Sequence, residues 1–214
     1  MKKLLIAMSL VFAMSAVGAQ VAHATSLVGS DYPNDISATI SSTLAGTSLT
    51  LQVTNTSGVE SYLTSLAFQV PSGLGLTFDG AFLADGTTPL IHQQNENTTY
   101  EWTFGTVTGN DVGNREAVRP YKDSVNFGLF TDGGFLGGKK VIGIADGDTA
   151  IFMFTVTDGS FTGLEPFLAR FQAVWDGDSL DGSDIATPTP IPGAAWLLGT
   201  GLFGLVGLRR KFRS

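Results

Sequence analysis

The chain has 214 residues, the length of one medium-sized domain with short processing segments at its ends. It contains no cysteine, so a disulfide framework, a thiol nucleophile and a cysteine-ligated zinc site are excluded. Residues 25–187 hold all 19 acidic residues but only six of the 12 basic ones, and this excess of 13 acidic groups argues against binding to DNA or RNA.

The N-terminus has the three-part pattern of a secretory signal peptide. Two lysines precede an apolar stretch over residues 4–17, and small side chains follow at Ala22 and Ala24. Signal peptidase requires small residues at these two positions, so cleavage is predicted after Ala24. A retained membrane helix is the alternative, but the apolar stretch is short for a span. The sequence therefore predicts a signal peptide over residues 1–24 and an exported protein.

The middle of the chain, residues 25–187, is predicted to be one β-domain. In residues 47–58, Leu49, Leu51 and Val53 alternate with polar residues, as in a strand with one face on a core. Residues 36–43 are its predicted hairpin partner. Further strand-like runs, separated by Asp-Gly and Gly-Gly turn signals, lie at 65–70, 74–78, 99–104, 125–130, 149–156 and 166–175.

About eight short strands without an amphipathic helix predict an antiparallel β-sandwich of immunoglobulin-like or jelly-roll type. A barrel is less favoured because its strands would be more regularly spaced. Aromatic residues at strand spacing are predicted to fill the core, and a sugar-binding platform is the alternative. These core candidates are Phe68, Trp102, Phe104, Phe127, Phe152, Phe154, Phe167 and Phe171.

The sequence does not predict an enzyme. Without the signal peptide, His92 is the only histidine, and it lies in the polar stretch HQQNENTT, which is predicted to be a loop. No GxSxG turn accompanies it, which argues against a serine hydrolase triad. Glu96 and Glu101 are the carboxylate pair to consider for glycoside cleavage, but their sequence spacing does not define the separation that this chemistry requires.

Four carboxylates gather in the segment WDGDSLDGSD: Asp176, Asp178, Asp181 and Asp184. Oxygen ligands at close spacing, with glycines that permit tight turns, are what a calcium site needs. The segment departs from an EF-hand loop, because no glutamate closes it. A solvated acidic linker after the last strand is the preferred interpretation. No cofactor is therefore predicted, and calcium stays open as the alternative.

The C-terminus, residues 188–214, has the pattern of a membrane anchor. Pro188, Pro190 and Pro192 form a stiff spacer. Residues 191–208 are an uncharged stretch whose helix would measure about 27 Å, close to the thickness of a bilayer core. The predicted span contains Ala194, Trp196, Leu197, Leu198, Leu202, Phe203, Leu205, Val206 and Leu208. The basic residues that stop it on the cytoplasmic side are Arg209, Arg210, Lys211 and Arg213.

A proline motif, an apolar helix and an arginine-rich end resemble the PEP-CTERM sorting signal of Gram-negative bacteria, in its Val-Pro-Leu-Pro-Ala (VPLPA-CTERM) variant. The motif positions here are Pro190, Ile191, Pro192 and Gly193. The resemblance implies cleavage near the motif by an exosortase, an integral-membrane cysteine protease. Members of the family are commonly encoded with exopolysaccharide production. The segments NTSG at 55–58 and RFQAVWDGDSLDGSD at 170–184 also resemble parts of other proteins with this tail.

Together these features predict an exported, non-enzymatic protein of the cell envelope or of a biofilm matrix. Signal peptidase and an exosortase would process it at the inner membrane, and its destination would be the cell surface or the matrix, with exopolysaccharide as a candidate partner. The alternative is a secreted carbohydrate-binding or carbohydrate-active module that uses the same tail. Exposed aromatic residues beside a polar groove would favour this alternative, whereas buried aromatic residues would favour the first interpretation.

Overall fold

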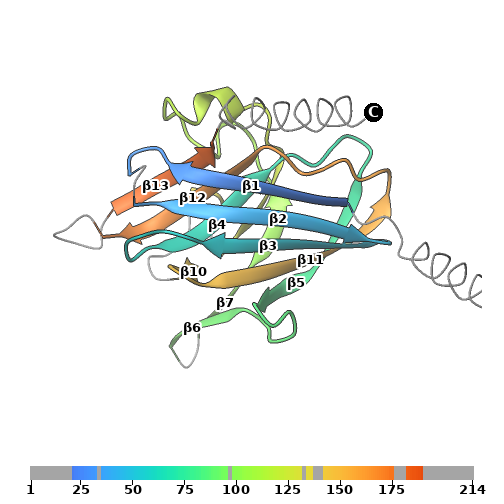
Figure 1. Cartoon of the computed structure of the whole chain (residues 1–214), viewed down its shortest axis with the longest axis horizontal. Coiled ribbons are helices and arrows are strands. Elements are labelled where there is room, and N and C mark those ends of the chain that lie inside the picture. The colour runs from blue at the N-terminus through green and yellow to red at the C-terminus, as the bar shows by residue number, and fades with distance from the viewer. Residues whose placement is uncertain are drawn as a thin grey trace, which may run out of the picture.

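A computed structural model describes residues 21–32, 35–95, 98–131, 134–136, 142–175 and 182–189. These residues form an all-β domain without an α-helix, as Figure 1 shows. Its strands are β1 (Val21–Gly29), β2 (Ser37–Ala45), β3 (Ser48–Asn55), β4 (Tyr62–Phe68), β5 (Gly75–Leu83), β6 (Ile91–Asn95), β7 (Thr98–Glu101), β8 (Thr103–Thr106), β9 (Phe127–Phe130), β10 (Ile144–Ala145), β11 (Thr149–Asp158), β12 (Phe167–Val174) and β13 (Gly182–Pro188), and a short 3₁₀ helix, η2, spans Arg119–Tyr121.

Eleven strands make one continuous antiparallel sheet in the order β5-β11-β3-β2-β1-β13-β12-β4-β9-β8, with β10 paired to β4. The sheet curls until it is nearly closed into a barrel (Figure 1). Its two end strands are β5 and β8, which do not pair with each other. The strands β6 and β7 form a separate hairpin.

The prediction of an antiparallel all-β domain is confirmed, but the sheet is continuous where a sandwich has two separate sheets. The junction between its halves is the pairing of β1 with β13, which runs from Leu27 opposite Pro188 to Gly29 opposite Ala186. The sequence predicts neither strand, because β1 begins inside the predicted signal peptide and β13 lies partly in the segment interpreted as an acidic linker. Their pairing joins the two halves into one curled sheet.

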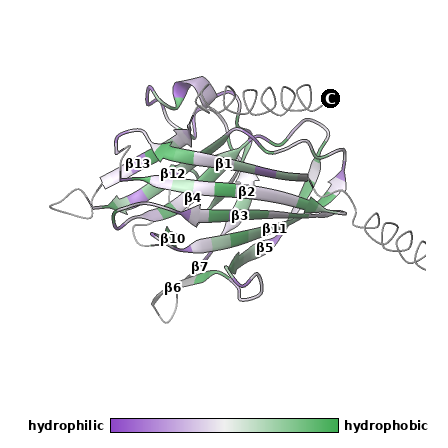
Figure 2. Ribbon diagram, in the orientation of Figure 1, coloured by the Kyte–Doolittle hydropathy of each residue, from purple (hydrophilic) through white to green (hydrophobic). Residues whose placement is uncertain are grey.

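The predicted alternation along β3 is confirmed, because Leu49, Leu51 and Val53 are completely buried. The predicted hairpin partner is β2, whose Ile40 lies opposite Val53. The turn between them contains Gly46 with φ of +65°, a conformation that favours glycine. Hydrophobic residues concentrate on the strands, whereas hydrophilic ones gather around η2 (Figure 2).

The predicted aromatic core is largely confirmed. Two of the eight candidates, Phe104 and Phe127, are only partly buried against the core. The ring of Phe154 on β11 lies edge-on to Phe68 of β4, with centroids 6.4 Å apart, and so joins the two halves of the sheet. The candidates that are buried are Phe68, Trp102, Phe152, Phe154, Phe167 and Phe171.

A second apolar cluster lies on the outer side of β4 and β12. The segment that leaves β8 and carries η2 contributes Val107, Val112, Val118 and Val125, which pack with residues such as Leu168 of β12. Because of this cover, β4 and β12 are buried on both faces along most of their length. Two-sided burial explains why these strands read as continuous apolar runs in the sequence.

No helix within the described ranges is long and apolar enough to cross a membrane. The predicted span over residues 191–208 lies outside those ranges.

Candidate functional site

Aromatic rings lie between the two end strands of the sheet, β5 and β8. Phe78 of β5 and Phe104 of β8 have ring centroids 6.2 Å apart, and each also contacts Phe154, at 5.2 Å. No backbone pairing joins β5 to β8. This seam is therefore held by side chains alone.

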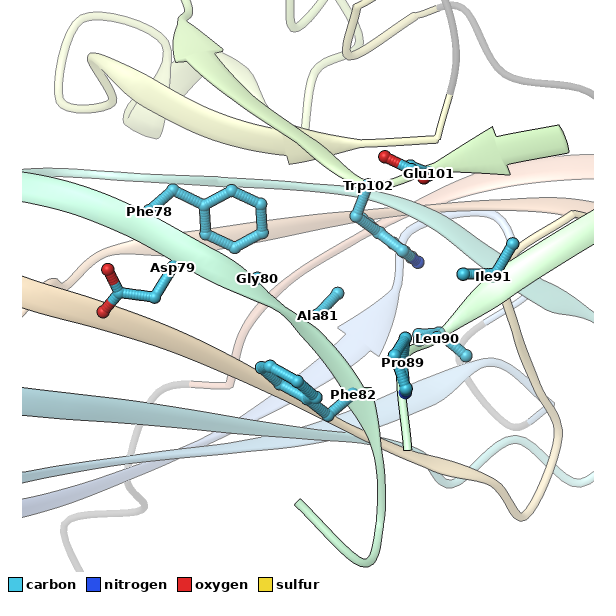
Figure 3. A pocket seen from close by; sticks show the side chains of 10 residues that line it. All are labelled: Phe78, Asp79, Gly80, Ala81, Phe82, Pro89, Leu90, Ile91, Glu101 and Trp102. Carbon is cyan, nitrogen blue, oxygen red and sulfur yellow. The ribbon is translucent and has the colours of Figure 1, made fainter. Parts of the chain in front are cut away.

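A pocket of about 510 Å³ opens beside the seam, between β5 and the hairpin formed by β6 and β7 (Figure 3). This size is within the range of small-molecule sites. We call it the seam pocket. The residues that line it are Phe78, Asp79, Gly80, Ala81, Phe82, Pro89, Leu90, Ile91, Glu101 and Trp102.

Trp102 gives the seam pocket its most distinctive group. Its side chain is almost fully buried, and its ring lies edge-on to Phe152, with centroids 4.9 Å apart. The indole extends toward Leu90 and Ile91 across the pocket (Figure 3). Its Nε1 is covered and has no hydrogen-bond partner among the described residues. The sequence correctly predicts Trp102 as a core residue, but it does not reveal that the indole N–H lacks an acceptor.

The carboxylates at the seam pocket differ in their surroundings. Asp79 is the extra residue of a β-bulge in β5, and its Oδ2 accepts a hydrogen bond of 2.8 Å from Thr155 Oγ1. Glu101, at the end of β7, is exposed. Its suggested catalytic partner Glu96 lies outside the described residues, so the pair is not defined.

The prediction that His92 lies in a loop is wrong, because its backbone belongs to β6, where it pairs with Tyr100 of β7. The polar stretch around His92 forms a hairpin because each strand supplies the other's backbone partners, and this does not require apolar side chains. No group of three or more His, Asp or Glu side chains in the described part of the chain could hold a metal ion.

Asp184, the last carboxylate of the predicted calcium segment, is completely buried in β13. Its oxygens accept hydrogen bonds from Ser30 Oγ at 2.8 Å and from the backbone amides of Asp31 and Tyr32 at 3.1 Å. The Ile185 amide and the Arg115 guanidinium, at 2.7 and 3.3 Å, also donate to it. A carboxylate with this many protein donors is not free for a cation.

The interpretation of residues 176–184 as a solvated linker is therefore wrong for its last part, because Gly182–Pro188 is a barrel strand. Glycine, aspartate and proline disfavour strands, so local sequence hides β13, which forms because both its edges find partners. The other three predicted calcium ligands, Asp176, Asp178 and Asp181, lie outside the described residues.

Close packing at Gly29 allows several backbone amides to lie within hydrogen-bond distance of the Asp184 carboxylate. A Cβ atom on Gly29, at the end of β1, would clash with the Asp184 carboxylate and would come within 2.9 Å of the Tyr32 carbonyl oxygen. The absence of a side chain at Gly29 thus lets the chain turn around the carboxylate.

The predicted signal peptidase site overlaps the first strand. Ala22 pairs with Thr43 and Ala24 with Ser41 of β2, so cleavage after Ala24 would remove the first four residues of β1. His23, between them, lies edge-on to Phe161 with ring centroids 6.0 Å apart. Residues before Val21 lie outside the described part of the chain.

The other end of the domain is attached to the same strand. Both the backbone amide and the hydroxyl of Thr189 donate to the carbonyl oxygen of Ser26, at 3.1 and 3.2 Å. The next residue is Pro190, the first of the predicted sorting motif. The motif, the predicted span and the basic end all lie outside the described residues.

Comparisons with protein-family models, with curated proteins and with solved structures find no match to this chain.

Proposed function

We propose that the chain is an exported, non-enzymatic protein of the cell envelope or extracellular matrix, sorted through a C-terminal signal of the PEP-CTERM type. In this proposal residues 1–24 direct export and residues 188–214 hold the protein in the inner membrane until an exosortase cuts the chain near Pro190–Gly193. The barrel is then delivered to the cell surface or to a biofilm matrix, with exopolysaccharide as a partner.

The observation that carries this proposal is the position of Thr189. The last barrel strand, β13, ends at Pro188, and Thr189 is bonded to β1 through Ser26. The proline motif begins at the following residue. A sorting signal works when a protease can reach an extended segment between a folded domain and the membrane, and the sequence supplies such a segment directly after the barrel.

The position of the aromatic residues favours this proposal over a module with an exposed sugar-binding platform. Phe152, Phe154 and Phe171 are completely buried inside the barrel, so these rings pack the core and do not present a flat sugar-binding platform. The single exposed tryptophan among the described residues is Trp175, at the end of β12.

Cell fractionation tests the proposal. The native chain is compared with a chain that ends at Thr189 and so keeps the barrel but lacks the tail. We expect the native protein in the envelope or matrix fraction, and the shortened one in the periplasm, because it lacks the anchor that holds it for transfer. Equal distribution of the two chains would contradict the proposal.

A further inference from the structure

The seam pocket contains a buried donor that no described residue satisfies. Trp102 is only 4% exposed, and its Nε1 has no acceptor within the described residues. An unsatisfied N–H group in a protein interior is costly, so such groups usually have a partner, which can be a protein atom, a water, an ion or a ligand. The pocket that this indole lines is the place from which an acceptor can arrive.

We propose that the seam pocket binds a neutral sugar of the size of a mono- or disaccharide, with the Trp102 indole N–H donating to one of its oxygen atoms. This proposal concerns the barrel alone and does not depend on the sorting function of the tail. It deepens one part of the proposed function, the exopolysaccharide partner, by naming a site and a ligand class for the barrel.

The walls of the pocket fit the apolar faces of a sugar ring. The aromatic rings of Phe78 and Phe82 and the side chain of Leu90 lie around the space into which Trp102 extends (Figure 3). Ile91, at the mouth, is 47% exposed although it is a large apolar residue. A ligand with C–H faces would cover this apolar surface and gain from its burial.

The polar groups of the pocket select among ligand classes. The described lining residues include no basic side chain, so an anionic ligand would meet only carboxylates and would be repelled. A cation would be attracted to Glu101 and to the aromatic rings, but it has no acceptor for the Trp102 N–H.

A sugar carries both kinds of polar group that the pocket residues can use. A sugar oxygen can accept from the Trp102 N–H, and other hydroxyls of the molecule are donors for an exposed carboxylate such as that of Glu101. A hydrocarbon offers neither interaction. The requirement for an acceptor, a donor and an apolar face therefore points to a neutral, hydroxylated ring.

Entry of the sugar requires a small displacement of the pocket wall, because Nε1 is covered in the empty pocket. The segment that faces β5 is attached to it by backbone hydrogen bonds from Leu90 to Ala81 and from Leu83 to Thr88, at 2.9 and 2.8 Å. It then continues into the separate hairpin β6–β7, which does not pair with the main sheet. Because the hairpin is not part of the main sheet, we expect a displacement of this segment to leave the strand pairing of the barrel intact.

Calorimetric titration of the full-length chain tests the proposal, in a detergent without a sugar headgroup. The probes are cellobiose and maltose, with glucuronate as the anionic comparison and choline as the cationic one. We expect at least one disaccharide to bind with a dissociation constant of about 0.1–1 mM, as is usual for a small polar ligand, and neither charged probe to bind as tightly.

Two variants locate the binding site. Trp102→Phe keeps an aromatic ring but removes the N–H, and we expect it to weaken binding about tenfold. Because the smaller ring also leaves space in the core, the thermal midpoint of the empty variant is measured to show that it remains folded. Glu101→Gln changes an exposed side chain, so it should not disturb folding, and we expect it to weaken binding about threefold. The matched control is Trp175→Phe, which removes an exposed indole that does not line the pocket and should not change affinity.

Three results would overturn the proposal. The first is an absence of heat with either disaccharide at 10 times the expected dissociation constant. The second is equal affinity of the native protein and both pocket variants. The third is tighter binding of choline than of either sugar, which would make the pocket a cation site. None of these results affects the proposal on sorting, which is tested by the location of the chain.

Discussion

The hydroxyl oxygen of Ser30 lies 2.8 Å from Oδ1 of Asp184, although 154 residues separate them in the chain. This contact joins the turn after β1 to β13, beside the short pairing that makes the sheet continuous. The buried Asp184 carboxylate thus connects the first strand of the barrel, β1, with the last one, β13.

Replacement of Asp184 by Asn tests this role. The asparagine side chain has one acceptor oxygen in place of two, and its NH₂ group would face the donors that now bind the carboxylate. We therefore expect the free energy of unfolding to fall by about 2–3 kcal/mol. Urea denaturation followed by circular dichroism measures the change. Asp148→Asn, at an exposed position, is the control and should stay close to the native value. A fall of equal size in both variants would contradict the assignment.

Calcium should not stabilise the protein, because Asp184 is already saturated with protein donors. A ligand that binds only the folded state raises the thermal midpoint by mass action. We therefore expect the same midpoint in millimolar calcium and in chelator. A rise with calcium that disappears in Asp178→Asn would instead show that the acidic segment is a calcium site.

The turn after β5 contains a carboxyl group with a low pKa. The Thr88 hydroxyl and the amides of Thr88 and Thr87 donate to Asp85 and lower its pKa to about 2, from an ordinary value of 3.8. A lowered pKa in the folded state stabilises the protein above the ordinary value, and this contribution disappears as the pH falls from about 4 toward 2. The turn that leads into the seam pocket should loosen in this range.

Thr88→Val should raise the pKa of Asp85 toward its ordinary value, since it removes the hydroxyl donor with the largest effect. An NMR titration of the Asp85 carboxyl carbon measures this shift. Thr87→Val is the matched control, because Thr87 acts mainly through its backbone amide, which valine retains. If both variants shift the pKa equally, the hydroxyl of Thr88 is not the main cause.

The first residue of the mature protein can be determined by N-terminal sequencing of envelope material. The sequence pattern predicts Thr25. Since β1 begins at Val21, a barrel that starts at Thr25 should be less stable than one that starts at Val21, because it lacks four residues paired with β2 and the contact of His23 with Phe161. Thermal melts of the two chains measure the difference. A mature N-terminus before Val21 would contradict cleavage after Ala24.

The sequence predicts well those elements that carry their own pattern. The strand β3 alternates apolar and polar residues, and β11 does the same through Ala150, Phe152 and Phe154, so single-sided burial is visible in both. The core positions of most aromatic residues follow from the same argument.

The missed features depend on contacts between distant segments. β13 forms because β1 and β12 lie on its two sides, and the covered β12 contains Ala173 at φ of +49°, within a bulge that no local pattern indicates. The seam pocket likewise depends on where β5 and the β6–β7 hairpin meet. The indole N–H of Trp102 lacks a partner among the described residues because of how these elements pack around it, which the residue type alone does not indicate.

We propose above that a protease recognises and removes the tail, and a blot tests this most directly, with one tag inserted in the exposed turn between Gly46 and Thr47 and another after Ser214. The test compares the native chain with Pro190→Ala/Pro192→Ala, and uses Pro188→Ala as a control proline outside the motif. Alanines would let the extended segment coil into the helix, whereas hydrophobic insertion needs neither proline. We predict that the native chain and the control lose the second tag only when the exosortase is present, and that the double variant stays full-length in the inner membrane. A native chain that keeps both tags in every strain would contradict the account and would make the protein a permanently anchored barrel.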